Sequence, residues 1–356
     1  MGHNHDDTNS FYRFKGGKWL ATEREGIGLD ETHGHNTLLI DGQGQYRPVA
    51  HYREADEFEG SDGFIQRTAN TAHFDYISAN ATNRYRQIPG MKAVNREVLF
   101  VRPDYFLMFD NIEAGEQHSY EWIVHFQEGS EIENNWIRGN AGDEQVLGVG
   151  IISPQKFSIN TGVDVLPYVR ISPEQPMANV RFLNVLYPTV SSAWQVKPAV
   201  TIVDENDVAL LAQLKMQNGS GRIDEVIFTE KPARNEKIGK YVFTGKLAAI
   251  TQSQELGVEK LFLLDCKYLK DDSSGIEFIK TEAENATVEF SFDEKTISIF
   301  GDVTQQIVLY GPTIETIVLN KKAIQYTRRG DYVFIFGDTT PPSPPVGVKA
   351  TPSEGD

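Results

Sequence analysis

The chain has 356 residues, of which 34 are Lys or Arg and 50 are Asp or Glu, so its formal net charge is −16. Apolar residues make up 40% and aromatic residues 11%, which suffices for a buried core and excludes a disordered chain. The acidic balance argues against nucleic-acid binding, which needs a basic face. No apolar run approaches the length of a membrane-spanning helix. The single cysteine, Cys266, excludes an intrachain disulfide and leaves the compartment open.

Short strands separated by polar turns are predicted along most of the chain. Residues 8–14 and 19–21, with glycines at 16 and 17 between them, predict a first hairpin. Residues 97–101 and 105–109 flank the turn sequence Arg102-Pro103-Asp104 and predict a second hairpin. Further strands are predicted at 120–126, 208–214, 287–292, 296–300 and 332–336, although the apolar run 208–214 would also suit a helix. This spacing predicts an all-β fold with little helix, in the form of a large antiparallel β-sandwich of several sheets.

Composition divides the chain into three parts. Residues 1–195 contain all eight histidines and are predicted to form one β-sandwich part. Residues 196–338 are richer in Lys and Glu and are predicted to form a second sandwich layer or subdomain, although two layers of one domain would give the same pattern. Residues 339–356 predict a proline-rich linker and the start of a fibronectin type III-like module, so we expect a fragment that is truncated at both ends.

The histidines are concentrated near the start of the chain, where five lie within the first 51 residues: His3, His5, His33, His35 and His51. Two pairs have the spacing i, i+2, which on a strand places both side chains on one face. Two such pairs on neighbouring strands, together with a carboxylate, would suit Zn²⁺. An affinity-tag remnant or ordinary surface histidines are the alternatives. The hairpin predicted directly after His5 favours ordered structure.

Three motifs in this region resemble those of the C-terminal β-sandwich domain of heparinase II/III-like polysaccharide lyases. Residues 3–11 are similar to the pattern H-x-H-x-D-x-x-S-F, and residues 35–45 to H-N-T-x-x-x-D-G-x-x-Q. Residues 19–26 are similar to L-A-x-D-x-G, with one extra residue before the glycine. Order and spacing agree from His3 to Gln45, and residues 96–100, 109–111 and 122–125 are similar to later landmarks of the family.

The resemblance implies a Zn²⁺ site, structural or site-organising, whose ligands are His5, Glu23 and His35. Glutamate stands at position 23 where the family commonly has aspartate, so Glu25 or Asp30 could take its place. The same comparison implies that His3 faces the substrate and assists catalysis. Independently of the family, Arg24 and Arg47 could hold a carboxylate or sulfate through a bidentate fork, and Tyr46 could stack on a sugar ring.

The activity that the resemblance implies is β-elimination in a uronate-containing glycan such as alginate or a glycosaminoglycan. The family's catalytic base lies in an N-terminal α/α toroid, for which this chain has no counterpart, so we expect the fragment alone to be inactive. The parent protein is expected to be extracellular or periplasmic, and neither nucleic acid nor membrane is an expected partner. A non-catalytic carbohydrate-binding or structural β-sandwich is the main alternative function. A metal-dependent hydrolase is the second.

Three later histidines carry weaker signals. His73 is expected to be a structural residue, His118 to lie in a surface loop, and His125 to pack on a strand beside Trp122.

Overall fold

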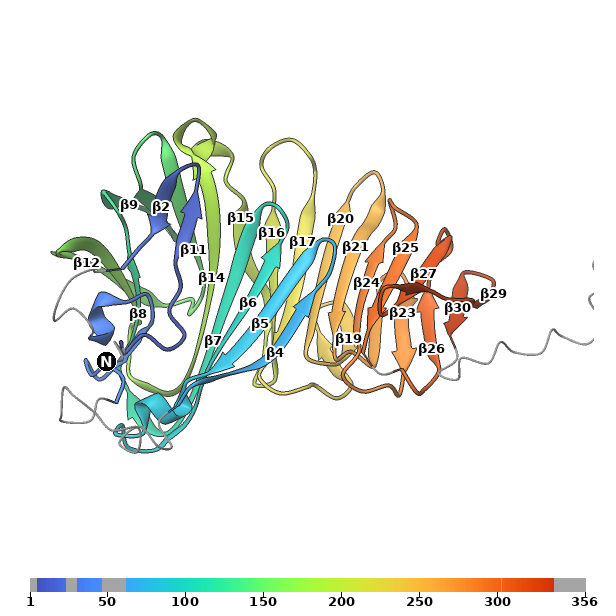
Figure 1. Ribbon diagram of the computed structural model, residues 1–356, viewed down its shortest axis with the longest axis horizontal. Helices are drawn as coiled ribbons and strands as arrows, with labels where there is room; N and C mark the ends of the chain where they lie inside the picture. The colour runs from blue at the N-terminus through green and yellow to red at the C-terminus, as the bar shows by residue number, and fades with distance from the viewer. Residues whose placement is uncertain (1–4, 24–30, 47–61, 302, 336–356) are drawn as a thin grey trace, which may run out of the picture. The chain divides into compact units, whose positions relative to one another are not determined.

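The computed structural model describes residues 5–23, 31–46, 62–301 and 303–335. Regular structure in these ranges is nearly all antiparallel strand (Figure 1). The helical segments among them are the 3-10 turns η1 (Thr32–Gly34), η3 (Thr82–Tyr85) and η4 (Ser191–Val196). The predicted all-β sandwich class with little helix is confirmed. The predicted linker at 339–356 lies outside the described residues.

An eight-stranded antiparallel sheet forms the base of the histidine-bearing part, in the order β4-β5-β6-β7-β14-β11-β10-β9. Its strands are β4 (Phe64–Asn70), β5 (Phe74–Asn80), β6 (Met91–Val101), β7 (Tyr105–His118), β9 (Gly129–Glu133), β10 (Trp136–Asn140), β11 (Gln145–Ser153) and β14 (Met177–Val190). The predicted hairpin is β6–β7, and its turn is closed where the Asp104 N–H donates to the Val101 carbonyl at 2.9 Å. Both strands run further than predicted, because cross-strand pairing continues to Met91 and Ala114.

A smaller antiparallel sheet has the order β12-β13-β8-β3. It consists of β3 (Leu38–Ile40), β8 (Tyr120–His125), β12 (Phe157–Asp164) and β13 (Leu166–Pro173). The first predicted hairpin is the separate pair β1 (Arg13–Lys15) and β2 (Lys18–Ala21). Its first strand begins at Arg13 rather than at residue 8, because Asp7–Ser10 form a turn in which Asn9 has a φ of 63°.

The core of this part is one buried cluster to which both sheets contribute. The alternating positions Trp122 and Val124 of β8 are fully buried, as is Val169 of β13. The eight-stranded sheet supplies buried side chains from β7, β10, β11 and β14, among them Met108, Ile137, Val149 and Phe182. Burial of each large apolar side chain stabilises the fold by about 1.5–3 kcal/mol, so these layers give a rigid base for the loops above them.

Three consecutive antiparallel strands follow, β15 (Ala199–Glu205), β16 (Ala209–Lys215) and β17 (Ile223–Thr229). The apolar run at 208–214 is therefore a strand, as predicted. The buried Tyr105 hydroxyl of β7 donates to Asp224 of β17 at 2.6 Å, and Phe109 stacks on Phe228 with ring centroids 5.0 Å apart. These contacts join β17 to the eight-stranded sheet.

The remaining strands form the second part of the chain. A seven-stranded sheet has the order β18-β19-β22-β23-β26-β30-β29. Its strands are β18 (Glu236–Ile238), β19 (Tyr241–Thr244), β22 (Tyr268–Asp271), β23 (Ile276–Thr281), β26 (Ile307–Tyr310), β29 (Thr327–Arg329) and β30 (Tyr332–Ile335). A further set pairs in the order β21-β24-β25-β27-β28, with β25 and β27 parallel: β21 (Gly257–Leu264), β24 (Thr287–Ser291), β25 (Thr296–Phe300), β27 (Thr316–Leu319) and β28 (Lys322–Ala323).

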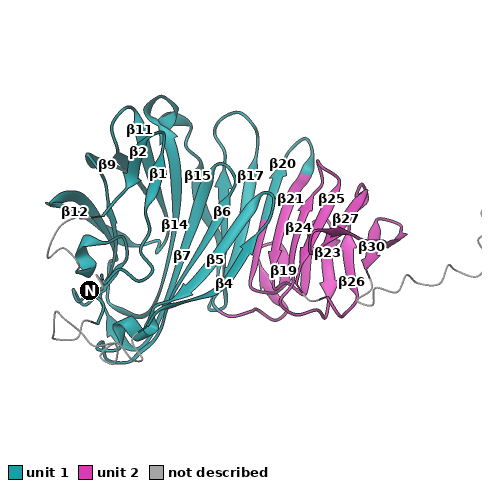
Figure 2. Ribbon diagram, in the orientation of Figure 1, with its two compact units in different colours: residues 1–230, 250–257 teal, residues 231–249, 258–356 magenta. Residues whose placement is uncertain are grey.

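The chain contains two compact units, which Figure 2 shows in different colours. One comprises residues 1–230 and 250–257, and the other residues 231–249 and 258–356, so the division passes through β20 (Leu247–Ser253) and β21. The domain boundary predicted between residues 195 and 196 stays a prediction. Among the described residues, no helix has the length and apolar character needed to span a membrane.

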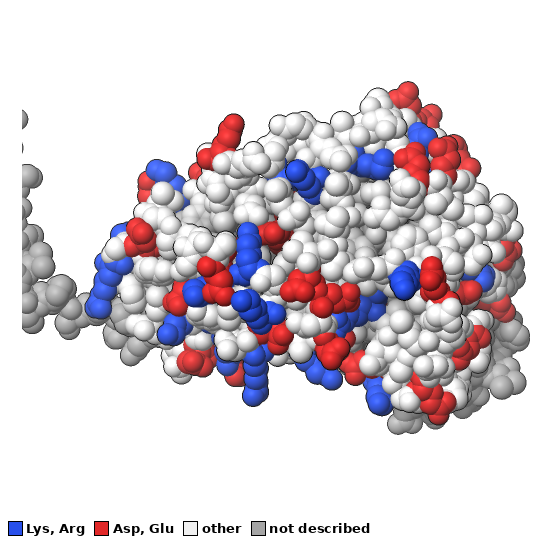
Figure 3. All heavy atoms as spheres, turned by 180° about the vertical axis from the view of Figure 1, so that it is seen from behind, with Lys and Arg blue, Asp and Glu red and all other residues white. Residues whose placement is uncertain are grey.

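Surface charge is mixed on the face that Figure 3 shows, where Lys and Arg side chains lie among Asp and Glu side chains. With a net charge of −16 over the whole sequence, long-range attraction of a polyanion is not favoured. The binding of an anionic ligand would therefore depend on contacts with individual basic or polar side chains.

Candidate metal centre

Two segments that are distant in sequence bring imidazoles together beside the small sheet. His5 lies in the N-terminal segment, and His35 follows the 3-10 turn η1; their ring centroids are 5.3 Å apart. His5, Asp7 and His35 each offer one ligand atom, and these atoms all lie within 4.8 Å of one another. Two imidazoles and a carboxylate at this spacing form a donor set that Zn²⁺ accepts, with room for a fourth ligand.

The expected arrangement of the two histidine pairs on neighbouring strands is wrong. His33 lies within the 3-10 turn Thr32–Gly34, and His35 caps that turn, so the two side chains do not share a strand face. His33 instead lies 3.3 Å from Glu31 and 3.4 Å from Asp164. Loops rather than paired strands bring His5 and His35 together.

The His35 ring is completely buried, and one carboxylate sets its tautomer. Nδ1 of His35 lies 2.7 Å from Oε2 of Glu23, whose side chain is 1% exposed. Burial alone raises the pKa of Glu23, but the hydrogen bonds from His35, Ser10 and Tyr12 outweigh it and keep that pKa below its usual value. The ionised carboxylate can only accept, so Nδ1 carries a proton, and Nε2 is the nitrogen that a neutral ring would offer to a metal ion.

Nε2 of His35 is buried and has no hydrogen-bond partner among the residues that the structure describes. Buried polar atoms are nearly always satisfied, so an unpartnered nitrogen on an imidazole that lies beside a second histidine calls for a ligand. A metal-binding histidine commonly donates its other ring nitrogen to a carboxylate, which fixes the ring and raises its basicity. The Glu23–His35 contact has this form.

The Glu23 carboxylate accepts hydrogen bonds from three side chains. Its Oε1 accepts from the Ser10 hydroxyl, and its Oε2 accepts from the Tyr12 hydroxyl as well as from His35. The predicted role of Glu23 as a direct ligand stays a prediction. In the structure Glu23 lies behind His35, and the carboxylate that lies beside both histidines is that of Asp7.

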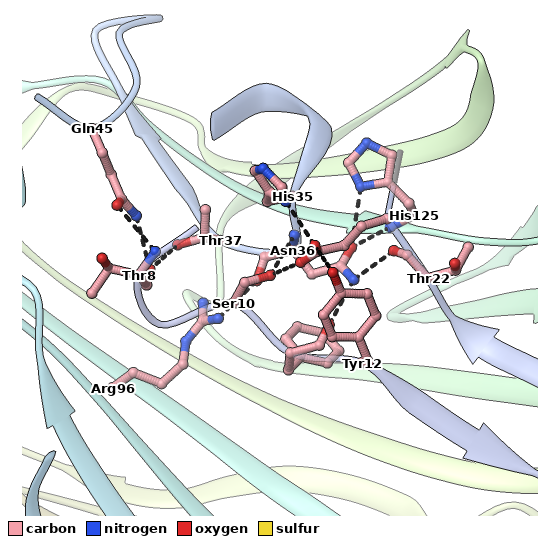
Figure 4. A network of polar contacts seen from close by, with 12 residues as sticks. Thr8, Ser10, Tyr12, Thr22, His35, Asn36, Thr37, Gln45, Arg96 and His125 are labelled. Carbon is pink, nitrogen blue, oxygen red and sulfur yellow. Dashed lines mark hydrogen bonds and ion pairs between the residues drawn. The ribbon is translucent and has the colours of Figure 1, made fainter. Parts of the chain in front are cut away.

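Asn36 joins the loop that carries His35 to three other segments (Figure 4). Its Nδ2 donates to the carbonyls of Phe11 at 2.8 Å and Thr22 at 2.7 Å, and its Oδ1 accepts from the backbone N–H of His125 at 2.7 Å. The Asn36 N–H donates to the Ser10 hydroxyl at 3.0 Å. The fully buried Asn36 side chain thus connects the loop of His35 to the segments that contain Phe11, Thr22 and His125.

A buried guanidinium fastens the two histidine segments to the large sheet. Arg96 of β6 donates from Nε and Nη2 to the two carboxylate oxygens of Asp110 of β7, at 2.6 and 3.1 Å. Its Nη1 donates to the carbonyl of Asn36 at 2.9 Å and also to the carbonyl of Asn9. Asp110 accepts further from Nε1 of Trp122 at 3.0 Å. We call Arg96 and Asp110 the arginine clamp.

The N-terminal segment is held on its other side by side chains from two loops. Gln45 accepts from the Thr8 N–H at 3.1 Å and donates to the Thr8 carbonyl at 2.8 Å, reproducing the pairing of a β-bridge. Arg84 of η3 forms a buried ion pair with Asp6 at 3.0 Å and donates to Gln45 at 3.2 Å. These bonds fix the backbone on either side of Asp7.

The structure covers only part of the predicted set. His5, Glu23 and His35 lie within one group of side chains, and their role as the ligands of one metal ion stays a prediction. The predicted residues that lie outside the described ranges are His3, Arg24, Arg47 and the two alternative acids Glu25 and Asp30. Tyr46 is half-buried, with the Arg86 guanidinium 3.9 Å from its ring centroid, and its predicted contact with sugar stays a prediction.

Asp7 is the residue of this group that the sequence analysis did not single out. It is the aspartate of the H-x-H-x-D pattern, two positions after His5, so the signal was present in the motif. Two later histidines are also placed. His125 is buried on β8, as expected, whereas His118 is buried at the end of β7 between Asp41 at 2.6 Å and the Pro89 carbonyl at 3.0 Å, so its expected surface position is wrong.

Comparison with protein families identifies one matching profile. The profile described as heparinase II/III-like, C-terminal, matches residues 28–219, which is more than half of the chain. The chain belongs to the heparinase II/III-like family. The match contains His35 and the arginine clamp, whereas His5, Asp7 and Glu23 precede it. No curated protein sequence matches the chain significantly.

Solved structures of this family are similar to the chain over part of their length. A heparinase III structure described as the BT4657 gene product has 14% identity and a TM-score of 0.49, and the match covers 64% of this chain and 37% of that one. The heparan sulfate lyase HepC from Pedobacter heparinus has 16% identity and a TM-score of 0.48, with 65% and 38% covered. The chain therefore spans little more than a third of the length of these structures.

Proposed function

We propose that this chain is the C-terminal part of a polysaccharide lyase that cleaves a uronate-containing glycan, such as a glycosaminoglycan, by β-elimination. Membership of the heparinase II/III-like family gives the reaction class. The observation that supports the proposal is the convergence of His5, Asp7 and His35, together with a buried Nε2 of His35 that has no hydrogen-bond partner among the described residues. A structural β-sandwich has no need to bury an unsatisfied imidazole nitrogen beside a second histidine.

In this proposal the chain supplies a metal site and one wall of the cleft. His5, Asp7 and His35 would hold Zn²⁺, while Glu23 holds the His35 ring from behind. Bound Zn²⁺ would cross-link the two histidine segments and supply local positive charge. The donor set fits the ion, because it contains two imidazoles and one carboxylate whose ligand atoms lie within 4.8 Å of one another.

The elimination itself removes the proton at C5 of a uronate and expels the sugar that is linked at C4. The developing charge spreads onto the uronate carboxylate, so a positive or hydrogen-bonding group must neutralise it. We propose that His3 contacts the substrate beside the metal and assists proton transfer. The catalytic base belongs to an N-terminal toroid of the parent protein. Because such glycans lie outside the cytoplasm, we place the protein in an extracellular or periplasmic compartment.

The test is an assay on the full-length product of the gene that encodes this chain. Incubation with heparan sulfate, hyaluronan or alginate should raise the ultraviolet absorbance of a conjugated 4,5-unsaturated product. His3→Ala should lower that rate by about 10²-fold or more, the scale of a lost proton-transfer group. New reducing ends without this absorbance would identify a hydrolase. Glycan binding without cleavage would identify a carbohydrate-binding sandwich, and either result would overturn the lyase.

A further inference from the structure

Three exposed aromatic side chains belong to the β1–β2 hairpin and to the residue that precedes it. Tyr12, Phe14 and Trp19 are 55%, 51% and 46% exposed, although large aromatic residues are usually buried. Trp19 lies between the other two, with ring centroids 5.9 Å from Tyr12 and 5.1 Å from Phe14, both edge-on. We call these three rings the aromatic face. A contiguous exposed patch of this kind commonly marks a binding surface.

The opposite face of the hairpin is the one that attaches it to the fold. The Arg13 guanidinium lies 4.8 Å from the ring centroid of Phe106, and Lys15 donates to the Pro188 carbonyl at 3.0 Å. Lys18 forms an ion pair with Asp143 at 2.8 Å. Phe14 pairs with Trp19 in the hairpin, and neither ring takes part in these contacts, so packing leaves the aromatic face unexplained.

The aromatic face begins at the candidate metal centre. The Tyr12 hydroxyl donates to Glu23, and the same carboxylate holds Nδ1 of His35 (Figure 4). Trp19 contacts Tyr12 on one side and Phe14 on the other. The Glu23 contact also fixes the Tyr12 ring, so part of the surface is pre-organised.

We infer that the aromatic face is a sugar-binding subsite, on which pyranose rings of the glycan stack beyond the point of cleavage; this rests on the proposed function. A polymer that reaches His5 and His35 must continue in at least one direction, and the aromatic face begins one residue away from His35. The rings are uncharged and flat, which suits the apolar C–H face of a pyranose rather than its carboxylate or sulfate. The subsite therefore recognises the sugar ring, while cations elsewhere recognise its charge.

Tryptophan fluorescence offers a direct probe, because the chain has four tryptophans and three are buried. Trp122, Trp136 and Trp194 are at most 4% exposed, so acrylamide quenching reports mainly on Trp19. Titration with heparan sulfate or hyaluronan oligosaccharides should protect Trp19 from the quencher. The protection should persist at high salt, which weakens ionic contacts much more than stacking.

Phe14→Ala should weaken oligosaccharide binding about 3- to 10-fold. Trp19→Ala should weaken it by at least as much, and calorimetry measures this affinity because the variant lacks the fluorescent probe. Phe64→Ala removes an aromatic ring on β4 that is 54% exposed, and serves as the matched control with unchanged affinity. The proposed subsite would be overturned if all three variants bound the oligosaccharides with the same affinity as the wild type, or if none of these glycans protected Trp19 from the quencher. The proposed subsite would also be overturned if Trp19 were already protected from the quencher without glycan, because of self-association or a bound protein segment.

The proposed function can fail independently of this subsite. Protection of Trp19 without any unsaturated product would retain the sugar-binding subsite and remove the lyase. Elimination at the wild-type rate and KM in Phe14→Ala and Trp19→Ala would retain the lyase and remove the subsite.

Discussion

Replacement of Arg96 by Gln should disturb the fold and the candidate metal centre together. Arg96 is 4% exposed and supplies four hydrogen bonds, two to Asp110 and one each to the carbonyls of Asn9 and Asn36. Gln cannot span these acceptors. Among the side chains that the structure describes, the carboxylate of the fully buried Asp110 then keeps one hydrogen-bond donor, Nε1 of Trp122.

The expected loss in unfolding free energy near neutral pH is about 3–5 kcal/mol, the usual cost of removing one member of a buried ion pair. Burial already raises the pKa of Asp110 against the opposing effect of Arg96, so the carboxyl of the variant should be protonated more readily. The loss in unfolding free energy should therefore become smaller as the pH is lowered, because protonation removes the unpaired charge. Urea unfolding followed by tryptophan emission measures the loss in unfolding free energy, since all four tryptophans lie in the unit that contains Arg96.

A double-mutant cycle separates the clamp from general destabilisation. Asp110→Asn combined with Arg96→Gln should cost less than the sum of the two single substitutions, because the two groups are paired. The Arg96 variant should also bind Zn²⁺ more weakly, since Asn9 and Asn36 adjoin the ligand segments. Strict additivity, with unchanged metal affinity, would refute the clamp as a positioning device.

The remaining predictions concern three other positions. Glu23→Gln should lower Zn²⁺ affinity by about tenfold or more, as measured by competition with a chromophoric chelator, because the amide no longer holds the ring as a carboxylate does. His118 and Ser119 hold the pKa of Asp41 below its ordinary value of 3.8 against the effect of burial. This lowered pKa stabilises the folded state at pH values above 3.8, and the stabilisation is lost as the pH falls through the pKa of Asp41 in the folded protein. Asp41→Asn should therefore lower the unfolding free energy by up to about 1 kcal/mol in thermal melts at neutral pH, and should have no effect in strong acid. Gly139→Ala should destabilise by about 1–3 kcal/mol in urea, because its new Cβ would lie 1.9 Å from the buried Phe126 ring.

Two of these predictions have a matched control variant. Glu31→Gln removes an exposed acid that lies near His33 and should leave metal affinity unchanged. Gly115→Ala places its Cβ no closer than 3.7 Å to any neighbour and should be tolerated. Equal losses in the glycine pair would contradict the packing argument. A cost for Asp41→Asn that persists in strong acid would contradict its electrostatic origin.

The strands of this fold were predictable where one face is buried and the turn chemistry is clear. The alternating residues of β24 and β25 and the turn at residues 102–104 identified their elements closely. Strand β12 was not predicted, because most of its residues are exposed and its sequence has no continuous apolar face. The β6–β7 turn also fixes a register in which Arg96 faces Asp110, and this pair lies one position beyond the predicted strands 97–101 and 105–109.

The candidate site was predictable in its histidines and not in its carboxylates. The motifs around His5 and His35 placed the two imidazoles together, but the i, i+2 rule failed for His33, because it applies to strands and η1 is a 3-10 turn. Which carboxylate lies beside both histidines depends on the path of the loop. The turn at Asp7–Ser10 directs Asp7 to the histidines and leaves Glu23 behind His35.

Metal analysis of the purified chain and its variants tests the central claim most directly. Wild-type protein that is loaded with Zn²⁺ and then desalted should retain equimolar metal. His5→Ala and His35→Ala should each lose it and melt at a lower temperature, since a bound ion stabilises the native state, whereas His33→Ala should retain both. Unchanged zinc stoichiometry in His5→Ala and His35→Ala would contradict the site and remove the structural basis of the proposed function.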